Sequence, residues 1–480
     1  MALNPLRLLE RADKWFLANG CGAMYAPPFP RWVEHVGFWD ECYWAEIRLE
    51  RLYTVFILDE QFRPVPMQFV GRRWRPDRLV LEWKGRGLRI RETRVVVGPG
   101  VFASKLEIRN GSNKPRDLNF ILWTMPEYRG EQPGGPAACG VRIEKNAALF
   151  GLKGRERDNE YLLHVALGAD REPTSHTINL SERTDTAPTW EIAPFAEKVR
   201  RSRLGAASPE AASASRRTGR ETPRPLQDGF YHIGLHYRLR IGGRGAETIT
   251  VGAAVSPEEG GARAALRDAL AEDVAKTSER EWRRFFRSVP YFECSDERLT
   301  RYYWYRWYGL RLLMVSVCRG MLRYPCVFEG IDGFRWHISY SAQCHMRECR
   351  WMHYPSFAEG SLLNFLANQL ENGSLPGHIG VCSHDQGFYH ADWGDAALAV
   401  YAIHEDKGFL KAICEPLVRY AEYFQRERDR EGMHLYDVVN QGETGQEYSS
   451  RYLFADPKAD EWRPIRLKGV DGTVYIYNLQ

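Results

Sequence analysis

The polar segment at residues 437–452, DVVNQGETGQEYSSRY, holds the residue types best suited to acid–base chemistry. Glu443 and Glu447 lie four residues apart among glycines and serines, and Arg451 follows four residues later. Catalytic groups concentrate on loops of rigid scaffolds, and two nearby tyrosines can supply the desolvation that a general acid requires. The same composition also fits a solvated loop with a Glu–Arg surface pair, so both interpretations stay open at this point.

A second cluster lies at residues 328–343, where a loop leads into a predicted helix. It includes Arg335, Trp336 and Gln343 together with acidic residues and a histidine. Aromatic faces for C–H surfaces, combined with guanidinium, amide and carboxylate groups for hydroxyls, are typical of sugar sites. The alternative is an ordinary helix start with Trp336 in the core.

A third cluster contains Tyr389, His390, Asp392 and Trp393, just before a predicted helix. Histidines and aspartates in this region would suit a metal, but no H-x-x-x-H pair or other known ligand spacing is present. We therefore expect a sugar-contacting loop, no metal site and no cofactor.

Several function classes lose support because their motifs are missing. The sequence has no G-x-x-x-x-G-K-[ST], no G-x-S-x-G and no glycine-rich dinucleotide fingerprint after a strand. The net charge of +4 comes from residues 197–226, where eight basic and three acidic residues give +5, so the rest of the chain is close to −1. This Ala/Ser/Arg-rich stretch is typical of a flexible insertion, and we expect no nucleic-acid partner.

The composition indicates a globular protein without a membrane partner. Of 480 residues, 44% are hydrophobic and 27% charged, and no apolar run is long enough to span a bilayer. The N-terminus lacks the apolar core of a signal peptide, and the ten cysteines form no C-x-x-C pair. These features favour reduced thiols and a cytoplasmic location, with a homo-oligomer as one possible state.

Residues 1–255 are predicted to form an antiparallel β-sandwich. Between about 30 and 255 the dominant period is two, most clearly at 230–241, where apolar residues alternate with His, Gly and Arg. This alternation predicts one buried and one solvated face. Turn sequences such as 98–100 and 110–113 separate the predicted strands.

The period changes after Val255. Ser256-Pro-Glu-Glu259 has the pattern of a capping box, and apolar residues then continue at helical spacing, which predicts one long linker helix over 256–290. Residues 291–480 are largely helical, with helices expected near 299–313, 341–352, 357–370, 393–404 and 409–424. Long aromatic and polar loops between successive helices suggest paired helices in a toroid.

With these features in place, the sequence resembles the clan of inverting α-glycosidases that includes trehalases, processing α-glucosidase I and mannosylglycerate hydrolases. The segment from Glu443 to Tyr452, ETGQEYSSRY, is similar to the clan motif E-[ST]-G-x-D-x-S-[PS]-R-[WY], and 369–376 is similar to Q-x-x-x-G-x-[IL]-P. The resemblance implies a β-sandwich followed by an (α/α)6 toroid. It places Glu447 on the general acid and Arg451 on a sugar-contacting arginine.

The sequence departs from the clan pattern at two positions. Glu447 stands where the clan has Asp, and Ser339 lies near an expected Asp, although Gly333-Phe-Arg335 fits the signature. The clan's general base is a Glu further downstream in the toroid. The sequence predicts about six toroid helices where a closed toroid has twelve. We therefore expect about the first half of the toroid here and the base outside these 480 residues.

The resulting hypothesis is an inverting glycoside hydrolase that cleaves a small, α-linked glucoside or related glycoside. Glu447 is the expected acid. The expected substrate contacts are Glu443, Arg451, Arg335, Trp336, Gln343, Tyr389, His390, Asp392 and Trp393. Three alternatives are a carbohydrate-binding protein without hydrolytic activity, a sugar phosphorylase and a sugar epimerase on the same toroid.

Overall fold

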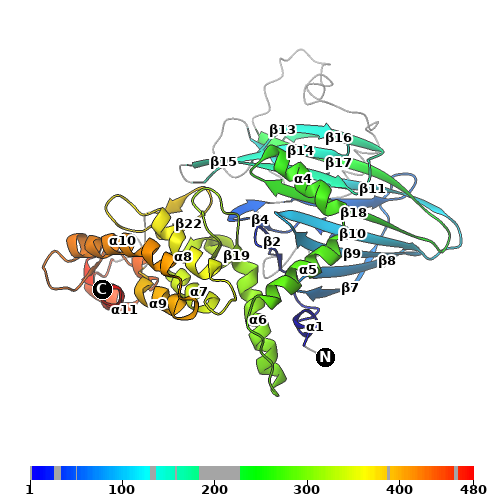
Figure 1. The fold of residues 1–480 in the computed structure, drawn as a ribbon. Coiled ribbons are helices and arrows are strands. Elements are labelled where there is room, and N and C mark those ends of the chain that lie inside the picture. The colour runs from blue at the N-terminus through cyan, green and yellow to red at the C-terminus, as the bar shows by residue number, and fades with distance from the viewer. Residues whose placement is uncertain are drawn as a thin grey trace, which may run out of the picture. The chain divides into compact units, whose positions relative to one another are not determined.

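The computed structural model describes residues 3–25, 34–49, 51–129, 137–156, 159–182, 228–385, 390–458 and 463–480. The insertion expected at 197–226 lies outside these residues. The chain divides into two compact units. Unit 1 comprises Met1–Arg284 and Cys294–Tyr308, and unit 2 comprises Phe285–Glu293 and Gly309–Gln480. Figure 1 shows that strands dominate the first part of the chain and helices the last part.

Unit 1 is built around two large antiparallel sheets. The first has the spatial order β13 (Ala137–Glu144), β14 (Ala147–Glu156), β15 (Asn159–Ala169), β18 (Ala246–Ser256), β10 (Val101–Asn110), β9 (Leu88–Val97), β8 (Arg78–Gly85) and β7 (Gln68–Arg75). The second has the order β12 (Glu127–Arg129), β17 (Asp228–Ile241), β11 (Arg116–Thr124), β6 (Tyr53–Leu58) and β3 (Gly37–Phe38), and β16 (Ser175–Glu182) also pairs with β17. A smaller sheet joins β1 (Leu17–Ala18), β2 (Gly22–Met24), β4 (Cys42–Trp44) and β5 (Ile47–Leu49).

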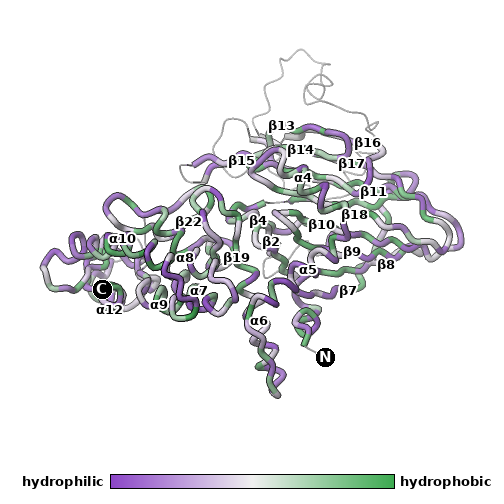
Figure 2. Tube along the Cα trace, in the orientation of Figure 1, coloured by the Kyte–Doolittle hydropathy of each residue, from purple (hydrophilic) through white to green (hydrophobic). Residues whose placement is uncertain are grey.

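The two large sheets pack against each other through buried side chains. The ring of Phe38 on β3 lies 5.3 Å from that of Phe102 on β10 in an edge-to-face arrangement. The hydroxyl of Tyr53 on β6 donates a hydrogen bond to Ser104 Oγ on β10, at 3.1 Å. Figure 2 shows hydrophobic and hydrophilic stretches alternating along the strands, as expected when one face of each sheet is buried.

The strand predicted over 230–241 is present as β17, but its predicted solvated face is covered over much of its length. His232 and His236 are buried, and only Arg238 and Arg240 on that face are exposed. The His232 ring stacks on Trp123, and His236 Nε2 lies 2.8 Å from Asn119 Oδ1. The prediction of one open face was wrong here because a cluster of apolar residues, including Trp39 and Trp123, covers it.

The segment predicted as one long helix forms two helices, α4 (Glu259–Leu270) and α5 (Val274–Arg287). Asp273 interrupts them, because its side chain accepts hydrogen bonds from the backbone N–H groups of Ala275 and Lys276. The predicted capping box is also absent: Glu258, and not Ser256, is the N-cap of α4. Leu266 of α4 packs into an apolar cluster with residues of the first large sheet.

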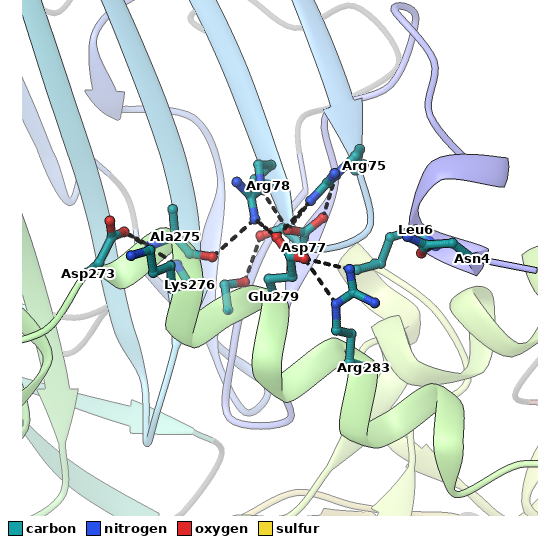
Figure 3. A network of polar contacts seen from close by, with 11 residues as sticks. Asn4, Leu6, Arg75, Asp77, Arg78, Asp273, Ala275, Lys276, Glu279 and Arg283 are labelled. Carbon is teal, nitrogen blue, oxygen red and sulfur yellow. Dashed lines mark hydrogen bonds and ion pairs between the residues drawn. The ribbon is translucent and has the colours of Figure 1, made fainter. Parts of the chain in front are cut away.

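Charged residues attach α5 to the turn between β7 and β8 (Figure 3). Asp77 is fully buried and pairs with Arg75 and Arg78, while Glu279 of α5 lies 2.6 Å from Arg78. Arg283, one helical turn further along α5, also pairs with Glu279. The network fixes the helix to the sheet by charge-assisted hydrogen bonds.

Unit 2 is helical. Its helices are α7 (Ser339–Cys349), α8 (Ser356–Ala367), α9 (Trp393–His404), α10 (Lys407–Tyr423), α11 (Ser450–Ala455) and α12 (Val470–Leu479), and α6 (Glu297–Leu313) ends in it. Helix α7 contacts both α8 and α9, and α9 contacts α12. Within the described part of the chain, no helix is both long and apolar enough to cross a membrane.

The coarse fold prediction is confirmed: antiparallel sheets precede a helical part. The helices expected at 341–352, 357–370, 393–404 and 409–424 correspond to α7–α10 with ends shifted by up to three residues. Helix α10 contains Pro416 and continues into a π-helical turn, η2 (Phe424–Arg428). That turn presents Arg428, which takes part in the candidate site.

Candidate functional site

The candidate site centres on the loop between η2 and α11, whose shape is set by a short hydrogen-bond network. Gln441 Oε1 accepts a hydrogen bond from the backbone N–H of Tyr448 at 2.6 Å. The Thr444 hydroxyl donates to the Gln441 carbonyl at 2.8 Å and accepts from the Tyr452 hydroxyl at 2.9 Å. Gly445 and Tyr448 have left-handed backbone, with φ of 63° and 62°, so the loop folds back twice within a few residues.

Glu443 is held by a buried ion pair. Its side chain is 5% exposed, and that of Arg428 is 8% exposed. Arg428 donates two hydrogen bonds to the carboxylate, at 2.6 and 3.2 Å, and the backbone N–H of Val439 donates a third at 2.7 Å. Burial lowers the pKa of Arg428, but the Glu443 carboxylate and Tyr423 raise it above its ordinary value. Glu443 therefore has the surroundings of a fixed anion.

Glu447 has different surroundings in the same loop. Its side chain is half-buried, and it forms no hydrogen bond or ion pair with any residue that the structure describes. Arg451, one helical turn later, is exposed and lies over the ring of Tyr452, with its guanidinium carbon 4.7 Å from the ring centre. The loop thus holds one carboxylate in place and leaves the other available.

His390 lies against the carboxylate of Glu443. Its backbone N–H donates to the Glu443 carbonyl at 3.4 Å, and its ring Nε2 lies 3.9 Å from Glu443 Oε2. Burial lowers the pKa of His390, while the charges of Glu443 and Asp471 oppose that shift. The positive charges of Arg428 and Arg451 lower it further, so the imidazole is neutral near pH 7.

Asp392 and Gln343 form a second polar group beside His390. Gln343 Oε1 accepts from the backbone N–H of Asp392 at 2.9 Å. One carboxylate oxygen of Asp392 caps α9 through the Asp395 N–H at 3.1 Å, and the other accepts from the Asn478 side chain at 2.9 Å. Asp392 therefore connects α7, α9 and α12. These hydrogen bonds account for a buried carboxylate at this position without a catalytic role.

Trp393, Trp336 and Arg335 contact aromatic side chains and not the Glu443 carboxylate. Trp393 is 1% exposed, and its ring centre lies 5.3 Å from that of Phe365. Trp336 is half-buried and packs beside His378, with the ring centres 5.1 Å apart. Arg335 is buried with its guanidinium over the ring of Phe328. Tyr389 lies outside the described residues.

Sequence reasoning missed three residues that organise the site. Arg428 stands in the run QRERDRE, which has the composition of a solvated charged surface. Arg347 bonds to Asp395 and lies 3.6 Å from Asp392, and Asn478 bonds to Asp392 from α12. The one sequence signal for the burial of Arg428 is Tyr423, five residues earlier. In the structure, the Tyr423 hydroxyl accepts a hydrogen bond from the Arg428 side chain.

The remaining polar groups of unit 2 show what else could take part in chemistry. Glu329 is half-buried, and burial raises the pKa of its carboxyl group, opposed by a hydrogen bond with Ser341. Among the described residues, no group of three His, Cys, Asp or Glu side chains could hold a metal ion. Neutral imidazole, one fixed carboxylate and one unpaired carboxylate suit proton transfer to a neutral substrate.

The comparisons with known proteins define the class. Residues 335–477 match the family model described as the mannosylglycerate hydrolase MGH1-like glycoside hydrolase domain. This segment contains all the site residues predicted from the sequence and is similar to a glycoside hydrolase domain, and the resemblance to the inverting α-glycosidase clan is confirmed. The predicted enzyme class, a glycosidase, is confirmed at the level of this domain. No curated protein sequence matches the chain.

Two solved structures were found to be similar to this chain. A putative kojibiose phosphorylase from the human microbiome superposes with a TM-score of 0.56 at 9% identity, covering 88% of this chain and 58% of that one. A bacterial glucoamylase complexed with acarbose gives a TM-score of 0.43 at 10% identity, with 86% and 56% covered. The first likeness supports a shared fold, and this chain spans little more than half the length of either protein.

Proposed function

We propose that the chain acts as an inverting glycoside hydrolase on a small, α-linked glucoside or related glycoside, with Glu447 as the general acid. One observation carries this assignment. Within the matched segment, Glu443 is fixed by Arg428 and Val439, while Glu447 has no partner among the described residues. A general acid has to exchange its proton with the leaving oxygen, and a carboxylate locked by a guanidinium is poorly suited to that role.

In the proposed reaction, Glu447 protonates the glycosidic oxygen as the bond to the anomeric carbon breaks. A second carboxylate, roughly 6.5–9.5 Å from the acid, then activates a water molecule on the opposite face of the sugar. The resemblance assigns that base to a Glu downstream of the motif. Glu447 is one methylene longer than the Asp of the motif, which extends its reach toward the leaving oxygen.

The substrate contacts follow from the surroundings of Glu447. Arg451 is exposed on the same loop and offers a guanidinium to sugar hydroxyls. His390 and Glu443 lie 3.9 Å apart and are further proposed contacts, together with Trp393 and with Gln343 and Asp392, which are hydrogen-bonded to each other. Arg335, Trp336 and Tyr389 belong to the same proposal as contacts from neighbouring loops. Cytoplasmic location and self-association likewise stay predictions from the sequence.

We also propose that 1–255 is a sandwich domain, that 256–290 links it to the helices, and that 291–480 corresponds to about the first half of an (α/α)6 toroid. Large apolar side chains on the later helices support the last point. Leu398 on α9 is 60% exposed, and Val470 and Tyr477 on α12 are 74% and 77% exposed. Further toroid helices packed against α9 and α12 would cover such side chains.

The test compares Glu447→Gln with wild type on two kinds of substrate. An unactivated α-linked disaccharide needs its leaving oxygen protonated, whereas a glycosyl fluoride leaves with little help. We expect the variant to lose about 10²- to 10⁴-fold in kcat on the disaccharide and far less on the fluoride. Glu415→Gln, an exposed residue of α10, is the matched control and should resemble wild type.

The outcome separates the hypotheses. Equal losses on both substrates would show that Glu447 acts on folding or binding instead of protonation. In a protein that includes the downstream Glu, binding of sugars without release of reducing sugar would refute hydrolysis and favour a carbohydrate-binding protein. Release of the product with inverted anomeric configuration, followed by NMR at early times, supports the proposed stereochemistry.

A sugar phosphorylase is the second candidate, because the better structural superposition is with a putative kojibiose phosphorylase. In that case phosphate would replace water as the nucleophile, and the product would be a sugar 1-phosphate. Turnover of the disaccharide that requires inorganic phosphate would identify this activity, while equal turnover without phosphate would exclude it.

A further inference from the structure

A hollow of about 920 Å³ lies at one end of the first large sheet of unit 1. The turn between β8 and β9 and the ends of β7 and β10 form it, and these strands lie side by side in Figure 1. Five basic residues line it: Lys84, Arg86, Arg89, Arg109 and Arg244. No acidic residue is among its lining residues in the described part of the chain.

Three of the cations stand in one row across the sheet. Lys84 on β8 pairs in register with Arg89 on β9, and Arg89 pairs in register with Arg109 on β10. Directly paired residues project on the same face, and all three are exposed. Like charges directly opposite each other destabilise a sheet, so this row is unfavourable in the absence of a counter-charge.

The adjacent row on the same face shows how the sheet otherwise arranges its charges. Two residues further along, Glu82, Arg91 and Glu107 are paired in the order acid, base, acid. Arg91 lies 4.0 Å from Glu82 and 3.7 Å from Glu107. The row of Lys84, Arg89 and Arg109 has no such partner among the described residues. Of these two rows, the one at the hollow therefore carries the uncompensated positive charge.

Hydrogen bonds between turns shape the hollow. The Gly111 N–H donates to the Gly87 carbonyl at 2.7 Å, which ties the end of β10 to the β8–β9 turn. Arg86 and Gly87 have left-handed backbone, with φ of 44° and 75°. Across the opening, Arg244 donates to the Asn113 side chain at 2.8 Å. Arg86 and Arg244 add two further cations from the turns that line the hollow.

We propose that this hollow binds an acidic oligosaccharide that carries several carboxylate or sulfate groups. Neighbouring strands are about 4.8 Å apart, so the three cations extend over roughly 10 Å and exceed the reach of a single anionic group. Pro66 and Met67 add apolar surface for sugar C–H groups. The described residues that line the hollow include no aromatic side chain, whereas single-stranded nucleic acid is bound by stacking on aromatic rings.

The experiment measures binding of the full chain to a heparin-derived hexasaccharide and a galacturonate hexamer by calorimetry. Maltohexaose, a DNA oligonucleotide and phosphatidylserine vesicles serve as comparison ligands. The test variant is Lys84→Gln/Arg89→Gln/Arg109→Gln. The matched control is Lys411→Gln/Arg419→Gln/Arg430→Gln, which removes the same charge from exposed positions of unit 2.

We expect the acidic oligosaccharides to bind at least tenfold more tightly than maltohexaose and to weaken as salt increases. The test variant should lose at least tenfold in affinity and the control less than twofold, and the test variant should unfold at the same or a higher temperature. Equal losses in both variants, a destabilised test variant, or tighter binding to DNA or vesicles would each overturn the proposal.

Discussion

Replacing Arg428 by Ala should destabilise unit 2 far more than replacing any exposed arginine. The substitution removes both hydrogen bonds to Glu443, at 2.6 and 3.2 Å, and leaves its carboxylate with the Val439 N–H as its remaining donor. Both side chains of the pair are less than 10% exposed. Removing one partner of a buried ion pair costs about 3–5 kcal/mol, because the other charge stays buried without compensation.

The assay is urea unfolding followed by far-UV circular dichroism, which reports on the helices. The matched control is Arg419→Ala on α10, whose side chain is exposed and has no partner among the described residues. We expect that control to change the free energy of unfolding by less than about 0.5 kcal/mol. The double variant Arg428→Met/Glu443→Leu should recover most of the loss, since an apolar pair of similar volume replaces the charges.

Two results would refute this reasoning. If Arg428→Ala costs less than about 1 kcal/mol, the pair behaves like a surface ion pair, and the distinction between a fixed Glu443 and an available Glu447 fails. If the double variant is less stable than Arg428→Ala, the loss comes from packing around Tyr423 and Asp437 and not from the uncompensated carboxylate.

The remaining predictions concern pH and packing in unit 2. Burial lowers the pKa of His337 to about 4, so the unfolded state binds a proton before the folded state does as the pH falls. The free energy of unfolding should therefore decrease by about 3 kcal/mol between pH 6.5 and pH 4. His337→Gln should make the free energy of unfolding, measured by urea titration at several pH values, depend less steeply on pH. Gly394→Ala should lower the free energy of unfolding by about 1–3 kcal/mol, because the added Cβ would lie 2.5 Å from the Asn478 carbonyl oxygen. Leu398→Ala, at an exposed position of the same helix, should lower it much less, as measured by thermal unfolding. Asp392→Ala should cost about 1–2 kcal/mol through the lost cap of α9, and Asp392→Asn should restore most of it; equal losses would contradict the capping role.

The local sequence pattern was sufficient to predict an element whose ends are set by residues next to it in the chain. The helix predicted at 393–404 has those ends, because Asp392 caps it through a bond three residues away and the chain turns at Glu405. The linker shows the limit of the same reasoning. Its apolar spacing continues past residue 271, but the side chain of Asp273 caps a new helix there, and periodicity does not detect such a break.

The candidate site shows the same limit. Glu443 and Glu447 share one loop and similar neighbours in sequence, and the motif alone suggests sugar contact for the first and proton donation for the second. Arg428 comes from a run of charged residues that resembles a solvated surface. Its burial depends on the π-helical turn at the end of α10, which directs the side chain to Glu443.

The sequence by itself determined the order of sheets and helices, the loop that carries the two carboxylates and the resemblance to a glycosidase clan. These features depend on residue types at short spacing, where side-chain periodicity and turn chemistry act directly. The tertiary structure decided which carboxylate is neutralised by an arginine and which is available, and it aligned three cations from three strands in one row. Both are matters of burial and register, which arise only when distant segments pack together.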